Sequence, residues 1–216
     1  MKVKNFALVV FSVLAFGDAN AQQSSYTGVP IGGQIWMSTN LDVTKFRNGD
    51  KIRQAQSDEE WEEAGFDKKP AWCYYNLEND TGGTDIVKRG IMYNSFAVND
   101  KRGLAPLGWH IPTEGEWNNL QFEVEIQGPG IASLFSNNLW SSAKGEFNSL
   151  GMNISPDGWR DVGCGGLDRD VTFWAKKVSD EDTPTVGFHL EEESIGKMDY
   201  GSTNWIMGHY VRCVKD

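Results

Sequence analysis

The side chains best suited to metal or redox chemistry are scattered along this chain. His110, His189 and His209 are its three histidines, and they lack the HExxH or His-x3-His spacing that places two imidazoles on one zinc ion. The sequence also lacks a Gly-x-Ser-x-Gly nucleophile elbow and a phosphate-binding Walker loop. Carboxylates are plentiful, but nothing in the sequence pairs two of them across a cleft, as a glycosidase requires. We therefore expect a protein that is not an enzyme and that carries no metal and no cofactor.

Oxygen-rich segments raise the separate question of calcium, a hard cation that needs several oxygen ligands. Residues 80–85 and 191–193 are two such segments. A polar loop and a solvated run of charge explain them better than a cation site does. We therefore assign no metal ligand in either segment.

Tryptophan is the other informative residue, with nine copies in 216 residues. An indole face that is left at a surface can stack on a sugar ring or anchor a protein partner. Four tryptophans lie in irregular surroundings and are our candidate ligand-binding residues: Trp140, Trp159, Trp174 and Trp205. The alternative for each is an ordinary place in the core of a loop-rich fold, since the enrichment of tryptophan at interfaces is only a tendency.

The element that is most clearly marked lies in the middle of the chain. Thr113 and Glu116 have the spacing of a capping box, and Gly128-Pro129 supplies a stop. Between these signals, apolar residues recur at helical spacing on one face: Trp117, Leu120 and Val124. The pattern predicts one amphipathic helix from residue 113 to about residue 127, after a strand-like approach through Trp109 and Ile111.

Short strands and turns dominate the remaining sequence. Ser57 and Glu60 indicate a second capped helix over residues 57–64, and residues 91–98 show a helix-like face. A first strand is predicted at residues 33–41. Later segments rich in β-branched and aromatic residues read as further strands: 171–175, 185–190 and 210–214. Helices and short strands of this kind predict an α+β fold.

The first 21 residues have the three parts of a secretory signal peptide. Lys2 and Lys4 form the basic start, residues 6–16 form the apolar stretch, and Ala19-Asn20-Ala21 is a small-x-small cleavage site. The apolar stretch is too short to span a bilayer. We expect residues 1–21 to be removed on export, so that the mature protein is secreted, periplasmic or held at the cell surface.

The mature chain reads as one domain. Residues 22–32 are expected to form a flexible N-terminal tail, and residues 33–216, without a repeat or linker, a single domain. The net charge of −10 argues against a nucleic-acid partner and against binding to anionic membrane lipids. We also expect no membrane insertion once the signal peptide has been cleaved.

Several stretches, in the right order, carry a resemblance to a known bacterial family. They are GQIWMSTNL at 33–41, FRNGD at 46–50, PAWCYYN at 70–76, RGLAPLGWHIPTEGEW at 102–117 and VRCVKD at 211–216. Together they resemble the Fibrobacter succinogenes major paralogous domain. More distantly, the central stretch is similar to formylglycine-generating-enzyme-like proteins, whose fold is C-type-lectin-like. The resemblance implies an α+β, C-type-lectin-like fold with short twisted antiparallel strands, two to three helices and long loops.

The same resemblance predicts which cysteines form a disulfide. An odd count in an exported chain predicts one disulfide and one leftover thiol. Cys73 and Cys213 both lie in family-matching stretches, so the resemblance favours a bond between them, with Cys164 left over. The alternative is that all three are buried as small hydrophobic side chains.

Departures from the family pattern lie in the second half. Residues 170–176 replace the family's GYWWSST and keep one tryptophan, Trp174. We expect the binding surface in the loops between Gly151 and Trp205, with Trp159 and Trp174 as its main residues.

The resulting prediction is a secreted, non-catalytic recognition or adhesion domain. Its partner would be a polysaccharide, or another glycan or protein of a cell surface. Two alternatives stay open. One is a divergent formylglycine-generating-enzyme-like enzyme, and the other is a structural cell-surface protein without a small ligand.

Overall fold

The computed structural model describes residues 26–75, 90–136, 140, 145–161, 163–167, 169–177, 185–191, 195–198 and 205–216. Within these residues the chain forms two sheets, one of four strands and one of nine, together with helices, which confirms the α+β class. The expected signal peptide lies outside the described part. No helix among the described residues is long and apolar enough to cross a membrane.

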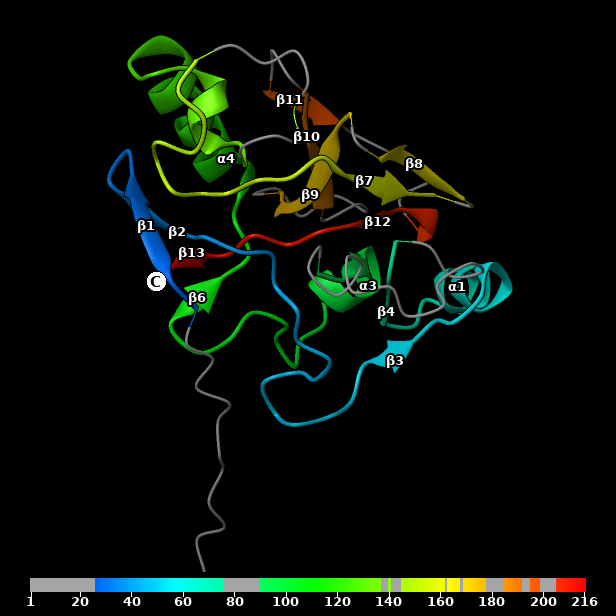
Figure 1. Ribbon diagram of the computed structural model, residues 1–216. Coiled ribbons are helices and arrows are strands. Elements are labelled where there is room, and N and C mark those ends of the chain that lie inside the picture. Colours follow the sequence, from blue (N-terminus) through cyan, green and yellow to red (C-terminus); the bar gives the residue numbers. More distant parts are fainter. Residues whose placement is uncertain are drawn as a thin grey trace, which may run out of the picture.

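The four-stranded sheet joins the two ends of the domain. Its order is β1-β2-β13-β6, with every neighbouring pair antiparallel. The strands are β1 (Gly28–Ile31), β2 (Gln34–Met37), β6 (Trp109–His110) and β13 (Val214–Lys215). Val214 lies opposite both Trp36 and His110, so the last strand is inserted between the first hairpin and the central stretch (Figure 1).

The first hairpin corrects the expected flexible tail. Residues 28–31, placed in the tail by sequence, form β1 and pair along their whole length with β2. The turn between the strands is Gly32-Gly33, and both residues have positive φ, at 56° and 78°. Two glycines with positive φ suit the tight hairpin turn whose twist matches that of the strands. The ordered domain therefore begins before residue 33.

The nine-stranded sheet has the order β11-β10-β9-β7-β12-β5-β4-β3, with β8 paired to β7. Two of its pairings, β3 with β4 and β7 with β9, are parallel. Its strands are β3 (Arg53–Gln54), β4 (Ala71–Cys73), β5 (Met92–Asn94), β7 (Asp157–Arg160), β8 (Cys164–Leu167), β9 (Val171–Lys176), β10 (Thr185–Leu190), β11 (Ile195–Met198) and β12 (Gly208–His209). The helical segments are α1 (Asp58–Phe66), α3 (Ser95–Val98), α4 (Glu114–Gln121), a π-helical turn η1 (Phe122–Ile126) and a 3-10 turn η2 (Ile131–Leu134).

The central helix forms where the sequence predicts it. Thr113 accepts from the backbone N–H of Glu116, and the Glu116 carboxylate accepts from that of Thr113, so the capping box is complete. The helix continues from α4 through the π-helical turn η1. A Cβ on Gly128 would lie 2.2 Å from the Glu123 carbonyl oxygen, so this close return of the chain requires glycine.

The buried face of α4 packs on the two long strands. The Trp117 ring stacks on Phe173 of β9 and Phe188 of β10, with 5.4 Å between centroids in each case. Its other neighbour is Trp36 of β2, at 4.8 Å. One tryptophan therefore joins the helix to both sheets, and its full burial makes it a centre of this core.

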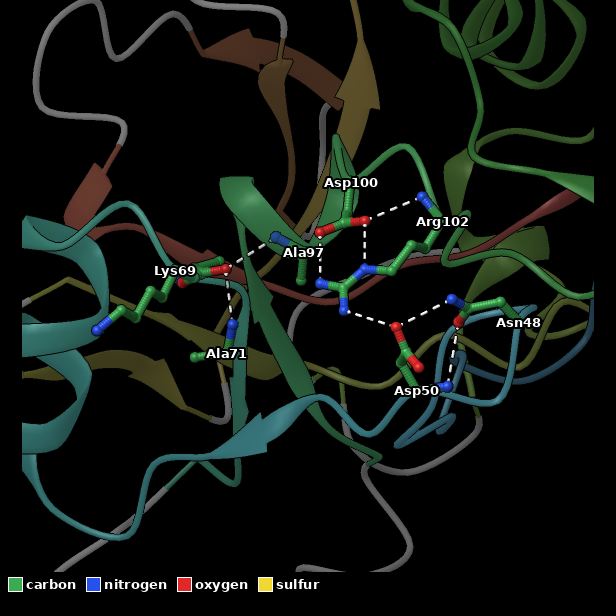
Figure 2. Close-up of polar contacts among 8 residues, drawn as sticks. Asn48, Asp50, Lys69, Ala71, Ala97, Asp100 and Arg102 are labelled. Carbon is green, nitrogen blue, oxygen red and sulfur yellow. Dashed lines mark hydrogen bonds and ion pairs between the residues drawn. The ribbon is translucent and has the colours of Figure 1, made fainter.

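Residues 91–98 are divided between a strand and a short helix. The Asn94 side chain ends β5 and caps α3, because its Oδ1 accepts from the backbone N–H of Ala97 at 3.0 Å. The same oxygen accepts from Ala71 N at 3.1 Å, and Nδ2 donates to the Lys69 carbonyl at 2.8 Å (Figure 2). One side chain thus fixes β4 against β5.

Contacts with the Arg102 guanidinium stabilise the family-matching turn at residues 46–50. Figure 2 shows the Arg102 guanidinium between two carboxylates: it lies 2.8 Å from Asp100 and 3.0 Å from Asp50. The same guanidinium lies 4.1 Å from the centre of the Phe46 ring, which adds a cation–π contact. These exposed contacts join two stretches that resemble the family, and they are structural.

The last strand is anchored by a buried arginine. Arg212 donates to the Asn40 side-chain oxygen and to the Met152 carbonyl oxygen, at 2.5 Å each. Asn40 in turn donates to Asp157 at 3.4 Å, at the start of β7. Removal of either partner would leave a buried polar group unsatisfied, which costs about 1–3 kcal/mol. Arg212 therefore connects the two sheets.

The expected disulfide between Cys73 and Cys213 is not formed. Both side chains are fully buried as thiols, but they lie in two different packed clusters. Cys73 packs in the cluster that contains Trp117, and Cys213 in the one that contains Trp174. Burial raises the pKa of the Cys213 thiol well above its ordinary value, which disfavours the reactive thiolate. The side chain of Cys164 lies outside the described part.

Candidate functional site

Two of the four candidate tryptophans belong to the core. Trp174 is fully buried, and its Nε1 donates to the Tyr93 carbonyl oxygen at 2.6 Å. Trp140 is 3% exposed, stacks on Phe135 with 3.9 Å between centroids, and donates to Ile154 O at 2.8 Å. Neither ring has a face at the surface, so Trp140 and Trp174 are not available for stacking on a ligand.

The burial of Trp174 follows from the position of β9 in its sheet. The strand is paired on one side with β10 and on the other with β7, and its first five residues are all buried. One face, with Phe173, packs under α4. The opposite face, with Thr172 and Trp174, is covered by the chain around His209. A strand covered on both faces gives no outward-pointing tryptophan.

Trp205 is accessible and firmly held. It is 37% exposed and lies in a short helical turn that includes residues 205–206. Trp61 of α1 donates its indole N–H to the Ile206 carbonyl at 2.9 Å. A Cβ on Gly65 would lie 2.8 Å from Cε3 of Trp205, so the glycine lets the indole approach the helix. This exposed ring therefore sits on a rigid support.

Trp159 lies half-buried in β7, beside a polar cluster. Its cross-strand neighbour in β8 is Gly165, which carries no side chain to cover the indole. The indole hydrogen-bonds the Asp170 carboxylate, which precedes β9. The pairing of β7 with β9 brings these two residues together, since Gly158 lies opposite Val171 and donates to the Asp170 carbonyl at 2.9 Å.

His189 of β10 completes the cluster. It lies directly opposite Thr172 in the antiparallel pair, and its Nδ1 is 3.0 Å from the Thr172 hydroxyl oxygen. Its Nε2 lies 3.4 Å from Glu191 Oε1 and 3.8 Å from Asp170 Oδ2. We call these five residues the Trp159 cluster: Trp159, Asp170, Thr172, His189 and Glu191.

Burial and neighbouring charges act in opposite directions on the ionisable groups of the cluster. Burial raises the pKa of Asp170, although His189, Arg169 and the hydrogen bond from Trp159 act in the opposite direction. The pKa of the nearby His209 falls to about 3, because burial and then the proximity of His189 disfavour its charged form. His209 is therefore neutral at physiological pH, and His189 is the imidazole that faces the carboxylates.

The groups of the cluster differ in their exposure to solvent. Thr172 is 1% exposed and its hydroxyl is bonded to His189, so a substrate has no path to this oxygen. What remains accessible is an indole, an imidazole and two carboxylates, of which Glu191 is the most exposed at 61%. Among the described residues, no group of three or more His, Cys, Asp or Glu side chains could hold a metal ion. Residues 80–85 and 192–193 lie outside the described part.

A second histidine network lies at the other sheet. His110 Nδ1 is 2.9 Å from Asp216, and Nε2 is 2.7 Å from Glu116, which also accepts from Thr113 in the capping box. Every partner comes from a family-matching stretch. Because both ring nitrogens are bonded within the protein, this network holds the scaffold and offers no vacant ligand position.

Trp159 and Trp205, proposed from the sequence, are the two candidate tryptophans that the structure leaves partly exposed, whereas Asp170, His189 and Glu191 were not proposed as a group. The strands β9 and β10 were predicted, but no pattern in the sequence gives the register that places His189 opposite Thr172. Gly158, just before Trp159 in β7, has a positive φ of 79°, which favours glycine at this position.

Comparison with known proteins places the chain in a family without supplying a ligand. The family model described as the Fibrobacter succinogenes major domain matches residues 29–215. Neither the comparison with curated proteins nor that with solved structures finds a match. The match spans both sheets and the Trp159 cluster.

Proposed function

We propose that this chain, which belongs to the Fibrobacter succinogenes major domain family, is an exported, non-catalytic recognition domain that binds a polysaccharide of a cell surface at the Trp159 cluster. The observation that carries the proposal is the half-buried Trp159 indole, fixed by the Asp170 carboxylate beside His189 and Glu191. A sugar presents an apolar ring face and a rim of hydroxyls. An indole with neighbouring carboxylate and imidazole groups complements both.

The surrounding scaffold supports this assignment. The Asn40–Arg212 pair, the capping box and the Arg102 contacts all serve the fold, and they come from the family-matching stretches. The Trp159 cluster instead comes from the second half, where the sequence departs from the family pattern. A fixed scaffold that carries a variable polar site is typical of recognition domains.

The other parts of the proposal rest on sequence. We propose a C-type-lectin-like arrangement for this α+β scaffold, because the capped central stretch is similar to that of proteins with such a fold. Residues 1–21 have the order of charge, apolar residues and small residues that directs export. A secreted, periplasmic or cell-surface location would bring the domain to a polysaccharide.

A glycan array with the mature secreted chain tests the proposal. We expect a defined set of glycans to bind, and Trp159→Ala to weaken the best of them by about 30-fold, or about 2 kcal/mol. Phe66→Ala is the matched control, because it removes an exposed aromatic ring outside the cluster. Thermal melts must show that both variants are folded. Equal binding by the wild type and by a folded Trp159→Ala variant would contradict the site, and a blank array would favour a structural protein.

A further inference from the structure

We infer that the end of the central helix is a docking surface for a basic segment of a protein partner, one that combines apolar side chains with lysine or arginine. We call it the Phe122 surface: Phe122 and Ile126, with Glu123 and Glu125 beside them. The surface lies apart from the Trp159 cluster, and its partner is independent of the polysaccharide proposed there.

Two large apolar side chains are left in solvent close to each other on this surface. Phe122 is 46% exposed and Ile126 is 69% exposed. Both belong to η1, and residues four positions apart are neighbours on the surface of a helix. A single exposed apolar residue is ordinary, whereas neighbouring ones mark an interaction site, and aromatic rings are enriched in protein interfaces.

The turn that carries these side chains is firmly held. Val124, which lies between them in sequence, is fully buried. Gln127 N donates to the Phe122 carbonyl oxygen at 3.2 Å, in the bonding pattern of a π-helical turn, and such turns are frequent at functional sites. The stem of Glu123 lies against the β1–β2 hairpin, because a Cβ on Gly32 would be 2.2 Å from Glu123 Cγ. A surface that is already ordered loses little freedom when a partner binds.

The charge around the two side chains selects the chemistry of the partner. The sequence has no lysine or arginine between Arg102 and Lys144. The same stretch has four glutamates, all of them on α4 or η1: Glu114, Glu116, Glu123 and Glu125. A partner that covers the apolar pair brings its own rim next to these carboxylates. Lysine or arginine is therefore favoured at that rim, and acidic residues are disfavoured.

The same charge argues against three other occupants. A symmetric dimer uses the same patch on both copies, so it would place Glu123 and Glu125 of one copy against those of the other. Helices that lie on a bilayer surface carry lysine and arginine on their polar side, and anionic lipids repel carboxylates. A polyanionic glycan is repelled for the same reason. A basic protein segment remains as the favoured partner.

The Phe122 surface and the Trp159 cluster lie on opposite sides of the same two strands. Helix α4 packs on Phe173 of β9 and Phe188 of β10. Thr172 and His189, the next residues along these strands, belong to the cluster and point to the other side, because side chains alternate along a strand. Both surfaces can therefore be occupied at the same time.

Fluorescence anisotropy with three synthetic peptides of about 15 residues, long enough to form a helix, tests the docking surface. The first peptide is an amphipathic helix of leucine and lysine. The second has alanine in place of every leucine, and the third has glutamate in place of every lysine. We expect the leucine–lysine peptide to bind at least about tenfold more tightly than either of the others.

A double variant assigns this binding to the surface. Phe122→Ser with Ile126→Ser should weaken the leucine–lysine peptide by about tenfold or more. Leu107→Ser is the matched control, because it removes an apolar side chain that is 64% exposed in another part of the molecule, and it should leave the affinity unchanged. In the nitrogen-15-labelled wild type, the amide resonances of residues 122–126 should shift with the peptide while the Trp159 indole resonance stays in place. This second measurement needs no variant, so it holds even if the double variant unfolds.

Each contrary outcome overturns the assignment in its own way. Equal binding of the alanine–lysine peptide would show attraction by charge alone, and equal binding of the leucine–glutamate peptide would refute charge complementarity. No binding of the leucine–lysine peptide, or equal weakening in the double variant and in Leu107→Ser, would refute the surface. A dimer in sedimentation that the double variant abolishes would make a second copy the occupant. Cosedimentation with phosphatidylglycerol vesicles that depends on the same residues would make it a membrane.

Discussion

The imidazole of His110 is bonded to the Glu116 carboxylate, with 2.7 Å between Nε2 and Oε1. Glu116 is also the acceptor of the capping box that begins α4. Asp216 holds the other ring nitrogen at 2.9 Å, so the C-terminus, β6 and the central helix meet at one side chain. The most recognisable stretch of the sequence therefore serves the scaffold.

This relationship predicts how stability depends on pH. Partial burial opposes the charge on His110, but the hydrogen bonds to Glu116 and Asp216 outweigh it and raise the pKa. A raised histidine pKa stabilises the fold below its unfolded value of about 6.5, and this contribution is lost as pH rises through the folded value.

Glu116 acts in the opposite direction. Its burial is outweighed by hydrogen bonds from Thr113 and His110, which lower its pKa. The stability that Glu116 contributes is therefore present above about pH 4.3 and is lost as pH falls through the folded value.

Urea unfolding at a series of pH values tests the role of His110. As pH rises above about 6.5, the His110→Gln variant should lose less stability than the wild type. Parallel curves for the two proteins would contradict this role of His110.

Trp174 and Trp140 should prove to be stability residues. Trp174→Ala removes a fully buried indole and its bond to Tyr93, so we expect a loss of about 3–5 kcal/mol in the free energy of unfolding. Chemical denaturation measures the loss. Trp205→Ala, at an exposed ring, should cost clearly less, and a Trp174→Ala variant as stable as the wild type would refute the burial.

Gly65 should be intolerant of any side chain. A Cβ there would lie 2.4 Å from the Trp205 carbonyl oxygen, which belongs to the backbone and yields only if the turn moves. We expect Gly65→Ala to destabilise the protein by about 1–3 kcal/mol, in the range of overpacked sites. Gly115→Ala is the control, because its nearest atom within 4 Å is Thr113 Oγ1 at 3.9 Å. Equal melting temperatures for the two variants would contradict the contact.

The buried thiols predict a clear chemical result. Native protein should protect Cys73 and Cys213 from alkylation, because both side chains are fully buried, and unfolding should expose both. Peptide mapping under non-reducing conditions should find no peptide that links them. A Cys73–Cys213 peptide from folded secreted protein would contradict the separation of their two clusters.

The local parts of the fold could be predicted from sequence because their signals are local. The capping box of Thr113 and Glu116 spans one helical turn, and β9 and β10 are marked by β-branched and aromatic residues. Residues 28–31 were predicted as a flexible tail because nothing local marks β1, which is formed by pairing with β2. Trp174 was predicted at a binding surface because its burial depends on strands that are far away in sequence. The Trp159 cluster depends on the register of β7, β9 and β10. No local pattern contains that register.

The indole N–H resonance of Trp159 gives the most direct test of the binding site. In a nitrogen-15-labelled sample, the Trp159→Phe variant identifies this resonance by its loss, and the best glycan from the array is then titrated into the wild type. We predict that the Trp159 resonance shifts in proportion to binding, since its N–H is bonded to Asp170, while those of the buried Trp140 and Trp174 stay in place. A glycan that binds without moving the Trp159 resonance would show that the ligand lies elsewhere.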